Sequence, residues 1–454
     1  MDEPGCESDV TPTFVLIFWE TYLGCAPSII NAVRSLSDAG HRSVLFIRQS
    51  DGPFVDPPDL GELTRLLIVD LDNATVTEAV NCPTHVAAIQ ESRVRGLARR
   101  FVPPPLRRPL GRWVDRRSMD HSNEYDIEAI DRFHDLTLSW IAKLTPTVIV
   151  GVDTVGIGVA KRLTDHYAQT QSKSGPELWY WSLEIMADCD RTGPVWKELR
   201  RREREAHAAS DLTIIQDEER WAQLRSSNNL SHGDHVIVPN SPRGILPEEF
   251  GNASKIESFK EEYFGIGSDR RVVLHAGSIS EGMRSAALAQ SAKDWPEPFD
   301  LVFHSHSTIG RHDSYARSVI EHGGDRVHLS TMPVDYDQLD TLYSAADVAV
   351  AIYDPNLGPN FRLLAGASGK LTHALKCGIP VISVGNPSIA RILDRYGCGV
   401  GVDDVQDVGT AITEIRNRWR TYHEHALDCF ARHYEFDRHF EKAIHRVSDC
   451  QPDR

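Results

Sequence analysis

The stretch GASGKLTHALKCGIPVI, residues 366–382, is the part of the sequence from which the fold can first be inferred. Gly366, Gly369 and Lys370 suggest a phosphate-binding P-loop at first sight. A P-loop, however, has four residues between its glycines and a serine or threonine after its lysine. Here two residues separate the glycines and Leu371 follows the lysine, so the stretch is not a P-loop.

The rest of this stretch predicts a short helix, a tight turn and a buried strand. Leu371, Ala374 and Leu375 have the i, i+3, i+4 spacing of one helix face. Gly378 is a helix stop. Residues 379–384 form a continuous apolar run, which is typical of a strand buried on both faces.

Apolar runs alternate with helical patterns on both sides of this stretch, and this alternation predicts parallel sheets with helices on both faces. The predicted strands are residues 13–19, 43–47, 147–152, 178–183, 212–215, 272–276, 301–304, 327–329, 348–352 and 379–384.

A cluster of Pro, Asn, Ser and Gly over residues 235–250 interrupts the alternation and is typical of a hinge. We therefore expect an α/β protein with two Rossmann-like domains, over residues 1–237 and 238–420. A helical tail over residues 421–454 is expected to pack back toward the first domain. Ligands of parallel sheets bind at the carboxyl ends of the strands, so two facing sheets place a cleft between the domains.

The composition is that of an ordinary globular protein. The 454 residues are 41% hydrophobic and 25% charged, with a formal net charge of -16, which argues against a nucleic-acid partner. No apolar run approaches the ~20 residues of a membrane span, and the acidic N-terminus does not suggest a secretory signal. The eight cysteines form no CxxC pair. Reduced thiols and a cytoplasmic location are the simplest interpretation.

Several segments, in this order, resemble the GT-B glycosyltransferases, and in detail the retaining family-four enzymes that use nucleotide sugars. The resemblance extends over residues 13–440. Its motifs are VIVGVDTVGIGVAKRL (148–163), LWYWSLEI (178–185), LHAGSISEGMRSAALAQSA (274–292), HLSTMPVDYDQLDTLYSAADVAVAIYDP (328–355) and ASGKLTHALKCGIPVISV (367–384).

The resemblance implies an acceptor-side first domain and a second domain that binds a nucleotide-diphosphate sugar as donor, with no separate cofactor. The expected donor-binding residues are Gly24, Gly277, Ser278, His304, His306, Pro333, Val334, Ser368, Gly369, Lys370, Leu371 and His373. His373 and Ser278 stand where the family often has a glutamate and an arginine, and Ala365 stands where it has a second glutamate. A neutral imidazole accepts one hydrogen bond where a carboxylate accepts two, so His373 offers the ribose hydroxyls of a nucleotide fewer acceptors than the family's glutamate does.

The expected catalytic residues are Asp153, Glu184, Lys370 and Arg284. Loss of a nucleoside diphosphate develops negative charge that fixed positive groups must stabilise. Lys370, Arg284 and the free N–H groups at the start of the predicted helix suit this role. An exposed helix cap for Lys370 and a surface position for Arg284 are the alternatives.

Asp153 and Glu184 each follow an apolar run, so both are expected at the cleft, where a carboxylate would orient a sugar or an acceptor hydroxyl. A simple helix N-cap is the alternative for Asp153. Gly24 follows the first strand and suits either a close approach to the ligand or a plain turn. His304 and His306 have no further ligand at metal-binding spacing, so no metal site is expected.

Residues 93–117, RVRGLARRFVPPPLRRPLGRWVDRR, oppose the acidic balance of the chain with nine arginines, from Arg93 to Arg117. The segment suits an anionic acceptor or peripheral contact with an anionic membrane. A solvated loop is the alternative.

These observations predict a cytoplasmic glycosyltransferase that moves a sugar to a glycan, a glycolipid or a small molecule, with retention and without metal. A nucleotide-sugar epimerase of the same fold and a non-catalytic binding protein are the two alternatives.

Overall fold

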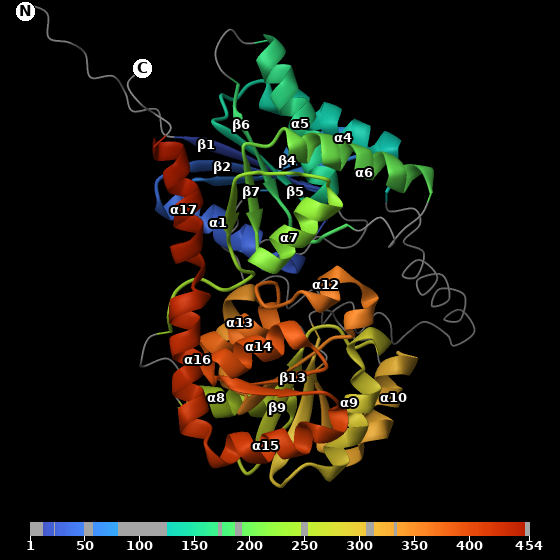
Figure 1. Cartoon of the computed structure of the whole chain (residues 1–454), viewed down its shortest axis with the longest axis vertical. Coiled ribbons are helices and arrows are strands. Elements are labelled where there is room, and N and C mark those ends of the chain that lie inside the picture. The colour runs from blue at the N-terminus through green and yellow to red at the C-terminus, as the bar shows by residue number, and fades with distance from the viewer. Residues whose placement is uncertain are drawn as a thin grey trace, which may run out of the picture.

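The computed structural model describes residues 12–21, 23–49, 58–79, 125–170, 175–186, 193–246, 253–305, 313–330 and 334–449. Two α/β bodies lie one above the other, each built around its own sheet (Figure 1). The arrangement confirms the predicted α/β fold with two Rossmann-like halves.

The first sheet contains eight described strands in the order β4-β3-β2-β1-β5-β6-β7-β8. All neighbouring strands are parallel except β3 and β4. The strands are β1 (Thr13–Phe18), β2 (Arg42–Arg48), β3 (Thr64–Asp70), β4 (Thr75–Glu78), β5 (Val148–Val152), β6 (Glu177–Trp181), β7 (Leu212–Ile215) and β8 (His235–Ile237). The helices around it are α1 (Pro27–Asp38), α4 (Ile127–Ile141), α5 (Asp153–Thr170), α6 (Pro194–Ala208) and α7 (Glu218–Ser227).

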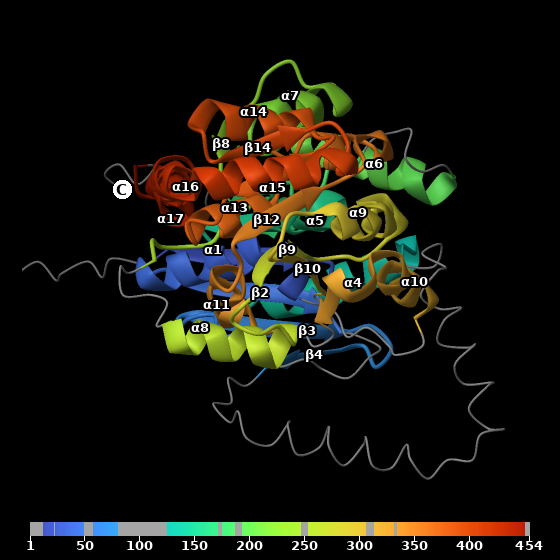
Figure 2. The same cartoon turned by 90° about the horizontal axis from the view of Figure 1, so that it is seen from below.

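The second sheet contains six described strands, all parallel, in the order β11-β10-β9-β12-β13-β14. They are β9 (Arg271–Ala276), β10 (Phe299–His304), β11 (Val327–Ser330), β12 (Val348–Ile352), β13 (Val381–Val384) and β14 (Gly399–Val402). Helices cover both of its faces (Figure 2). These are α8 (Ala253–Phe259), α9 (Ser285–Ser291), α10 (Ser314–Gly323), α11 (Leu339–Ser344), α12 (Pro359–Arg362), α13 (Gly369–Lys376), α14 (Pro387–Tyr396), α15 (Val408–Asn417) and α16 (Trp419–His433).

The last helix, α17 (Phe436–Asp449), returns to the first half of the molecule (Figure 1). Its apolar residues, among them Phe436 and Phe440, belong to the core under the first sheet, and Phe440 stacks on Trp181 of β6. The α16–α17 pair therefore joins the two halves a second time, in addition to the chain after β8.

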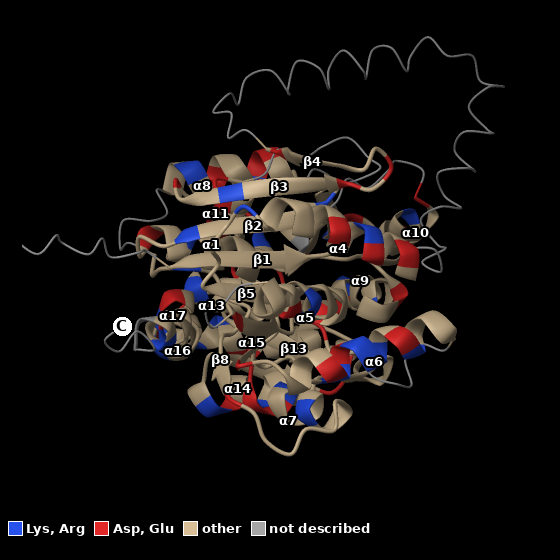
Figure 3. Cartoon of the chain, turned by 90° about the horizontal axis from the view of Figure 1, so that it is seen from above, with Lys and Arg blue, Asp and Glu red and all other residues tan. Residues whose placement is uncertain are grey.

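The central strands are buried because their side chains are apolar on both faces. Every residue of β5 and β12 is buried, as expected for parallel strands covered by helices. Charged side chains lie mainly on helices and loops (Figure 3). None of the described helices is long and apolar enough to cross a bilayer.

Some strand limits differ from the prediction for identifiable reasons. Leu183 was expected to end a strand, but β6 ends at Trp181, and the N–H of Leu183 donates to the carboxylate of Asp153 instead. β13 begins after Pro380, which has no N–H to donate. β3, β4, β8 and β14 were not predicted. β4 is polar, β8 is short and β14 is rich in glycine, so none of these three carries a clear apolar run.

Candidate functional site

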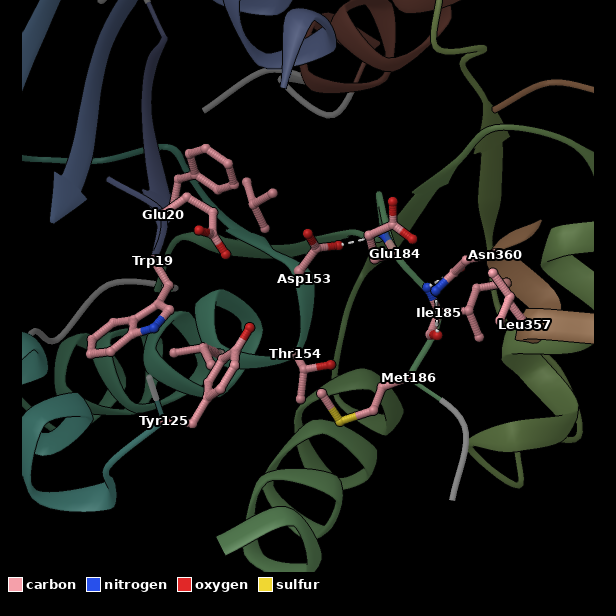
Figure 4. Close-up of a pocket in the computed structure, with 13 residues that line it drawn as sticks. Trp19, Glu20, Tyr125, Asp153, Thr154, Glu184, Ile185, Met186, Leu357 and Asn360 are labelled. Atoms are coloured by element: carbon pink, nitrogen blue, oxygen red, sulfur yellow. Dashed lines mark hydrogen bonds between the residues drawn. The ribbon is translucent and has the colours of Figure 1, made fainter. Parts of the chain in front are cut away.

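A cavity of about 340 Å3 lies where the carboxyl ends of β1, β5 and β6 meet the segment that follows β12 (Figure 4). Glu20, Asp153 and Glu184 bring carboxylates to it from the first half of the chain. Leu357 and Asn360 border it from the second half. The cavity therefore lies between the two halves, where facing parallel sheets are expected to bind ligands.

Two glycines explain how α5 packs so closely behind this cavity. A Cβ atom on Gly151 would lie 2.3 Å from Cα of Ile157, and one on Gly156 would lie 2.4 Å from the carbonyl oxygen of Ile17. Without side chains at these positions, α5 packs directly on β1 and β5. The close packing fixes the turn at Asp153, the first residue of the helix.

Asp153 holds the turn after β6. Its backbone is left-handed, with φ of 55°, and its Oδ1 accepts the N–H groups of Leu183 at 2.6 Å and Glu184 at 2.9 Å. The pKa of Asp153 is raised to about 8, first by burial and also by the charges of Glu184 and Glu20, while the two N–H groups oppose the rise. A simple N-cap would accept a backbone N–H from the first turn of α5. Among the described residues, Asp153 makes no such hydrogen bond.

The side chain of Glu184 is accessible to solvent through the cavity, although protein atoms surround its carboxyl group on the other sides. This partial enclosure raises the pKa of its carboxyl group, and the charge of Arg220 opposes the rise. Asp153 and Glu184 therefore form a pair of carboxyl groups that face one cavity and differ in their hydrogen bonding.

A buried polar network lies behind the β5–α5 corner, where Asp153 and Thr154 line the cavity. The carboxylate of Glu203, which is completely buried, accepts hydrogen bonds from Thr154 at 2.9 Å and from Tyr180 at 2.8 Å. Arg200 donates to the same carboxylate at 2.5 Å. Since Thr154 lines the cavity next to Asp153, the network holds the β5–α5 corner in a single arrangement.

A second group of candidate residues surrounds the start of α13. Ser368 caps this helix, and its Oγ accepts the N–H of Leu371 at 3.3 Å. The Nζ atom of Lys370 lies 4.7 Å from the centre of the Tyr353 ring and 3.8 Å from the sulfur of Met283. Burial lowers the pKa of Lys370 to about 7.

Lys370 makes no ion pair with any residue that the structure describes. Its stem packs against Gly277, where φ is +120° and a Cβ atom would lie 2.8 Å from the Cε of the lysine. The loop after β9 and the start of α13 thus surround one partly dehydrated cation, an arrangement that favours an anion.

The other predicted site residues, the catalytic candidate Arg284 among them, lie in differing surroundings. Arg284 has a left-handed backbone, with φ of 48°. Its guanidinium forms an ion pair with Asp404 at 3.2 Å. Ser278 is exposed beside Gly277. Gly24 is exposed in a short 3-10 helix, Leu23–Cys25.

Four further residues are buried or partly buried. His304 is buried, with its Nδ1 2.9 Å from the Oγ of Ser330. His373 stacks on Tyr343, its Nδ1–H donates to the carbonyl of Gly369 at 3.1 Å, and burial lowers its pKa. Leu371 is a core residue, and Val334 packs at the edge of the same core. His306, Pro333 and the segment Arg93–Arg117 lie outside the described residues.

Sequence reasoning missed several residues of the cavity. Glu20 follows an apolar run as Asp153 does, so the same pattern would have identified it. Trp19 and Tyr125 form aromatic walls, and nothing in the sequence distinguishes them from core residues. Asn360 reaches the site only because the two halves dock, which local sequence patterns do not show.

The docking of the halves depends on Asn360. Its Oδ1 accepts the N–H of Ile185 at 2.8 Å, and its Nδ2 donates to the carbonyl of Ile185 at 2.9 Å. Arg220, almost fully buried, donates to Asn360 and to the carbonyl of Leu363 from the other half. Gly366 lies so close that a Cβ atom would be 2.2 Å from the carbonyl oxygen of Gln216.

Among the described residues, no group of three or more His, Cys, Asp or Glu side chains is arranged to hold a metal ion. The carboxylates of the cavity are thus spread around its wall and do not converge on one point (Figure 4).

No protein-family profile and no curated protein sequence matches the chain. Solved structures do. Sucrose-phosphate synthase from Thermosynechococcus elongatus is 16% identical, with a TM-score of 0.62 over 97% of this chain and 100% of that one. HepE from Anabaena, in complex with UDP and glucose, is 9% identical, with a TM-score of 0.60 over 96% and 100% of the two chains.

WaaG, a glycosyltransferase involved in lipopolysaccharide biosynthesis, is 13% identical, with a TM-score of 0.57 over 96% of this chain and 100% of that one. All three similarities extend over nearly the whole chain. They confirm the GT-B fold that the order of the sequence motifs predicted.

Proposed function

We propose that this protein is a glycosyltransferase that moves a sugar from a nucleotide-diphosphate sugar to a hydroxyl group of an acceptor bound between its two halves. The observation that carries the proposal is Lys370, a partly dehydrated cation at the start of α13 with no carboxylate partner among the described residues. The charge of the lysine would stabilise a diphosphate bound there, and the free N–H groups at the start of the helix would donate hydrogen bonds to it.

The proposed reaction needs few groups. The bond between C1 of the sugar and the β-phosphate oxygen breaks, and its electron pair leaves with the nucleoside diphosphate. The acceptor hydroxyl oxygen bonds to the same face of C1, and its proton passes to a phosphate oxygen of the leaving group. Lys370 stabilises the developing charge, while Asp153 and Glu184 orient the acceptor from the opposite sheet.

UDP-glucose is the donor to test first, because structures of HepE, similar in fold, contain UDP or UDP-glucose. Incubation of the protein with UDP-glucose and candidate acceptors, with release of UDP measured by chromatography, tests the proposal. Lys370→Ala should abolish release. Turnover should continue in EDTA, and the anomeric proton of the product should show retention.

The same experiment separates the alternatives. An epimerase would convert UDP-glucose to a second nucleotide sugar without acceptor and without release of UDP. A binding protein would be stabilised by UDP and show no turnover. Either outcome would refute the transferase proposal.

Peripheral contact of Arg93–Arg117 with an anionic membrane and a cytoplasmic location remain proposals from the sequence. Co-sedimentation with anionic vesicles that weakens as salt rises would support the contact, since charge attraction at a surface is screened over about 8 Å at physiological ionic strength. Equal sedimentation with neutral vesicles would contradict it.

A further inference from the structure

The cavity between the halves has mainly apolar and aromatic walls. Among its described lining residues, this character comes above all from Trp19, Tyr125, Val155, Ile185, Met186 and Leu357. We propose that the acceptor it binds is a phenol, that is, a hydroxyl group on an aromatic body of one or two rings. This inference rests on the proposed function and names the chemical class of the acceptor.

Apolar groups face the cavity from both halves of the chain. Trp19 and Tyr125 lie on one side of it, and Leu357, from the second half, lies on the other (Figure 4). Leu357 is 51% exposed, so a ligand in the cavity would cover apolar surface that water now contacts. An aromatic body suits this space, because ring–ring contacts are favourable beyond their buried area and the thioether of Met186 packs well against rings.

The polar side chains of the lining are mostly engaged with the protein. Oδ1 of Asp153 accepts two backbone N–H groups, Thr154 donates to a buried carboxylate, and both amide atoms of Asn360 bind backbone groups. Glu20 also has an interaction partner of its own. The carboxyl group of Glu184 makes no hydrogen bond to a described residue, so it is the acceptor that a ligand hydroxyl would meet.

This supply of polar groups suits a ligand with a single hydroxyl group better than a sugar. A sugar would bring several hydroxyl groups between apolar walls, and each one left without a partner costs free energy. A phenol would direct its one hydroxyl group to Asp153 and Glu184 and its ring to the apolar walls.

The chemistry of the site also favours a phenol. The pKa of Asp153 is about 8, so its carboxyl group is mostly protonated at pH 7 and does not take up the proton of the acceptor. A phenol, with an ordinary pKa of about 10, loses its proton more readily than a sugar hydroxyl does. In the proposed reaction the phenol oxygen bonds to C1 of the sugar, and its proton passes to a phosphate oxygen of the leaving nucleoside diphosphate.

The volume of the cavity sets the size of the ligand. An apolar cavity of about 150 Å3 holds one benzene ring. The volume here is about 340 Å3, so one or two rings fit, and a larger ring system would extend into solvent.

Three probes test the proposal: 2-naphthol, which has two aromatic rings and one hydroxyl group, its saturated counterpart decahydro-2-naphthol, and glucose. Their dissociation constants would be measured by ligand-observed NMR on the full chain in the presence of UDP. We expect 2-naphthol to bind more tightly than glucose by about tenfold or more, and severalfold more tightly than decahydro-2-naphthol.

Leu357→Asp places a carboxylate in the apolar wall and should weaken binding of 2-naphthol about tenfold, because burial of that charge under a ring is costly. Leu357→Met keeps the wall apolar and should retain the affinity of the wild type. Ile320→Asp is the matched control, since Ile320 is an exposed apolar residue of α10 outside the described lining, and it should leave the affinity unchanged.

Four results would overturn the proposal. These are binding of glucose as tight as that of 2-naphthol, equal binding of decahydro-2-naphthol, binding of none of the three probes, and binding of 2-naphthol that Leu357→Asp does not change.

This experiment is independent of turnover. Release of UDP from UDP-glucose with sugar acceptors but not with 2-naphthol would leave the transferase function standing and refute the phenolic acceptor. Selective binding of 2-naphthol without release of UDP with any acceptor would refute the transferase function and leave the selectivity of the cavity standing.

Discussion

Lys370 lies directly against Gly277, so closely that a Cβ atom on the glycine would come within 2.8 Å of the Cε of the lysine. Contact with a backbone lacking a side chain lets the lysine stem turn toward Tyr353, where its ammonium group lies over the ring. The loop after β9 and the start of α13 therefore act as one unit, and each is needed to place the cation.

We expect Gly277→Ala to weaken binding of UDP at least tenfold, because the added methyl group displaces Lys370. The positive φ of Gly277 adds backbone strain to this effect. Gly324→Ala is the matched control, since Gly324 also has a positive φ, of +63°, but open space around it. Isothermal titration with UDP measures both variants. Equal losses in the two would assign the effect to strain and not to Lys370.

We expect UDP binding to be accompanied by proton uptake near pH 7 to 8. Burial lowers the pKa of Lys370 to about 7, so part of the population is neutral there, and a diphosphate would favour the charged form. Affinity should therefore fall as pH rises above 7. Titrations in buffers of different ionisation enthalpy measure the uptake.

Lys370→Ala should remove the proton uptake and weaken binding about tenfold to a hundredfold, the usual range for a hydrogen bond to a charged group. An unchanged uptake in this variant would show that another group takes up the proton.

The sequence predicted the parallel sheets and the helix start at Ser368 because both depend on local patterns. Ser368 caps α13, and Gly378, which was expected to stop this helix, follows its end with a positive φ. The roles of Asn360 and Tyr353 were not predicted. Asn360 acts across the interface between the halves, and Tyr353 supports Lys370 from the end of another strand, so both depend on tertiary contacts that no periodicity encodes.

Asp153→Asn separates two roles of this residue. Asparagine tolerates a left-handed backbone and can accept the N–H groups of Leu183 and Glu184, so the turn should be kept. If the carboxyl group orients the acceptor by hydrogen bonding, turnover should fall tenfold or more while UDP binding is unchanged. Full turnover in the variant would reduce Asp153 to a structural residue.

The same variant should change the pH dependence of stability. The pKa of Asp153 is raised by folding to about 8 from an ordinary value of 3.8, so the folded state binds its proton more tightly. The stabilisation of the folded state that comes from this proton is fully present below about pH 4. It is lost as pH rises toward 8, by at most about 1.4 kcal/mol per pH unit. Asparagine does not titrate, so the variant lacks this loss. The free energy of unfolding of Asp153→Asn minus that of the wild type should therefore be more positive at pH 8 than at pH 5. Urea unfolding at the two pH values measures this.

Asn360→Ala should loosen the docking of the two halves. It removes both hydrogen bonds to the backbone of Ile185 and one acceptor of Arg220, and such unsatisfied groups typically cost about 1–3 kcal/mol each when buried. We expect kcat/KM to fall about tenfold and the radius of gyration in small-angle scattering to increase.

UDP affinity should change less than twofold, because Lys370, Gly277 and Tyr353 all belong to the second half of the chain and remain in place. Asn417→Ala, at the exposed end of α15, is the control and should match the wild type in all three measurements. A loss of UDP affinity equal to the loss of turnover would show that Asn360 supports the donor site itself. Unchanged turnover would show that closure between the halves does not limit the reaction.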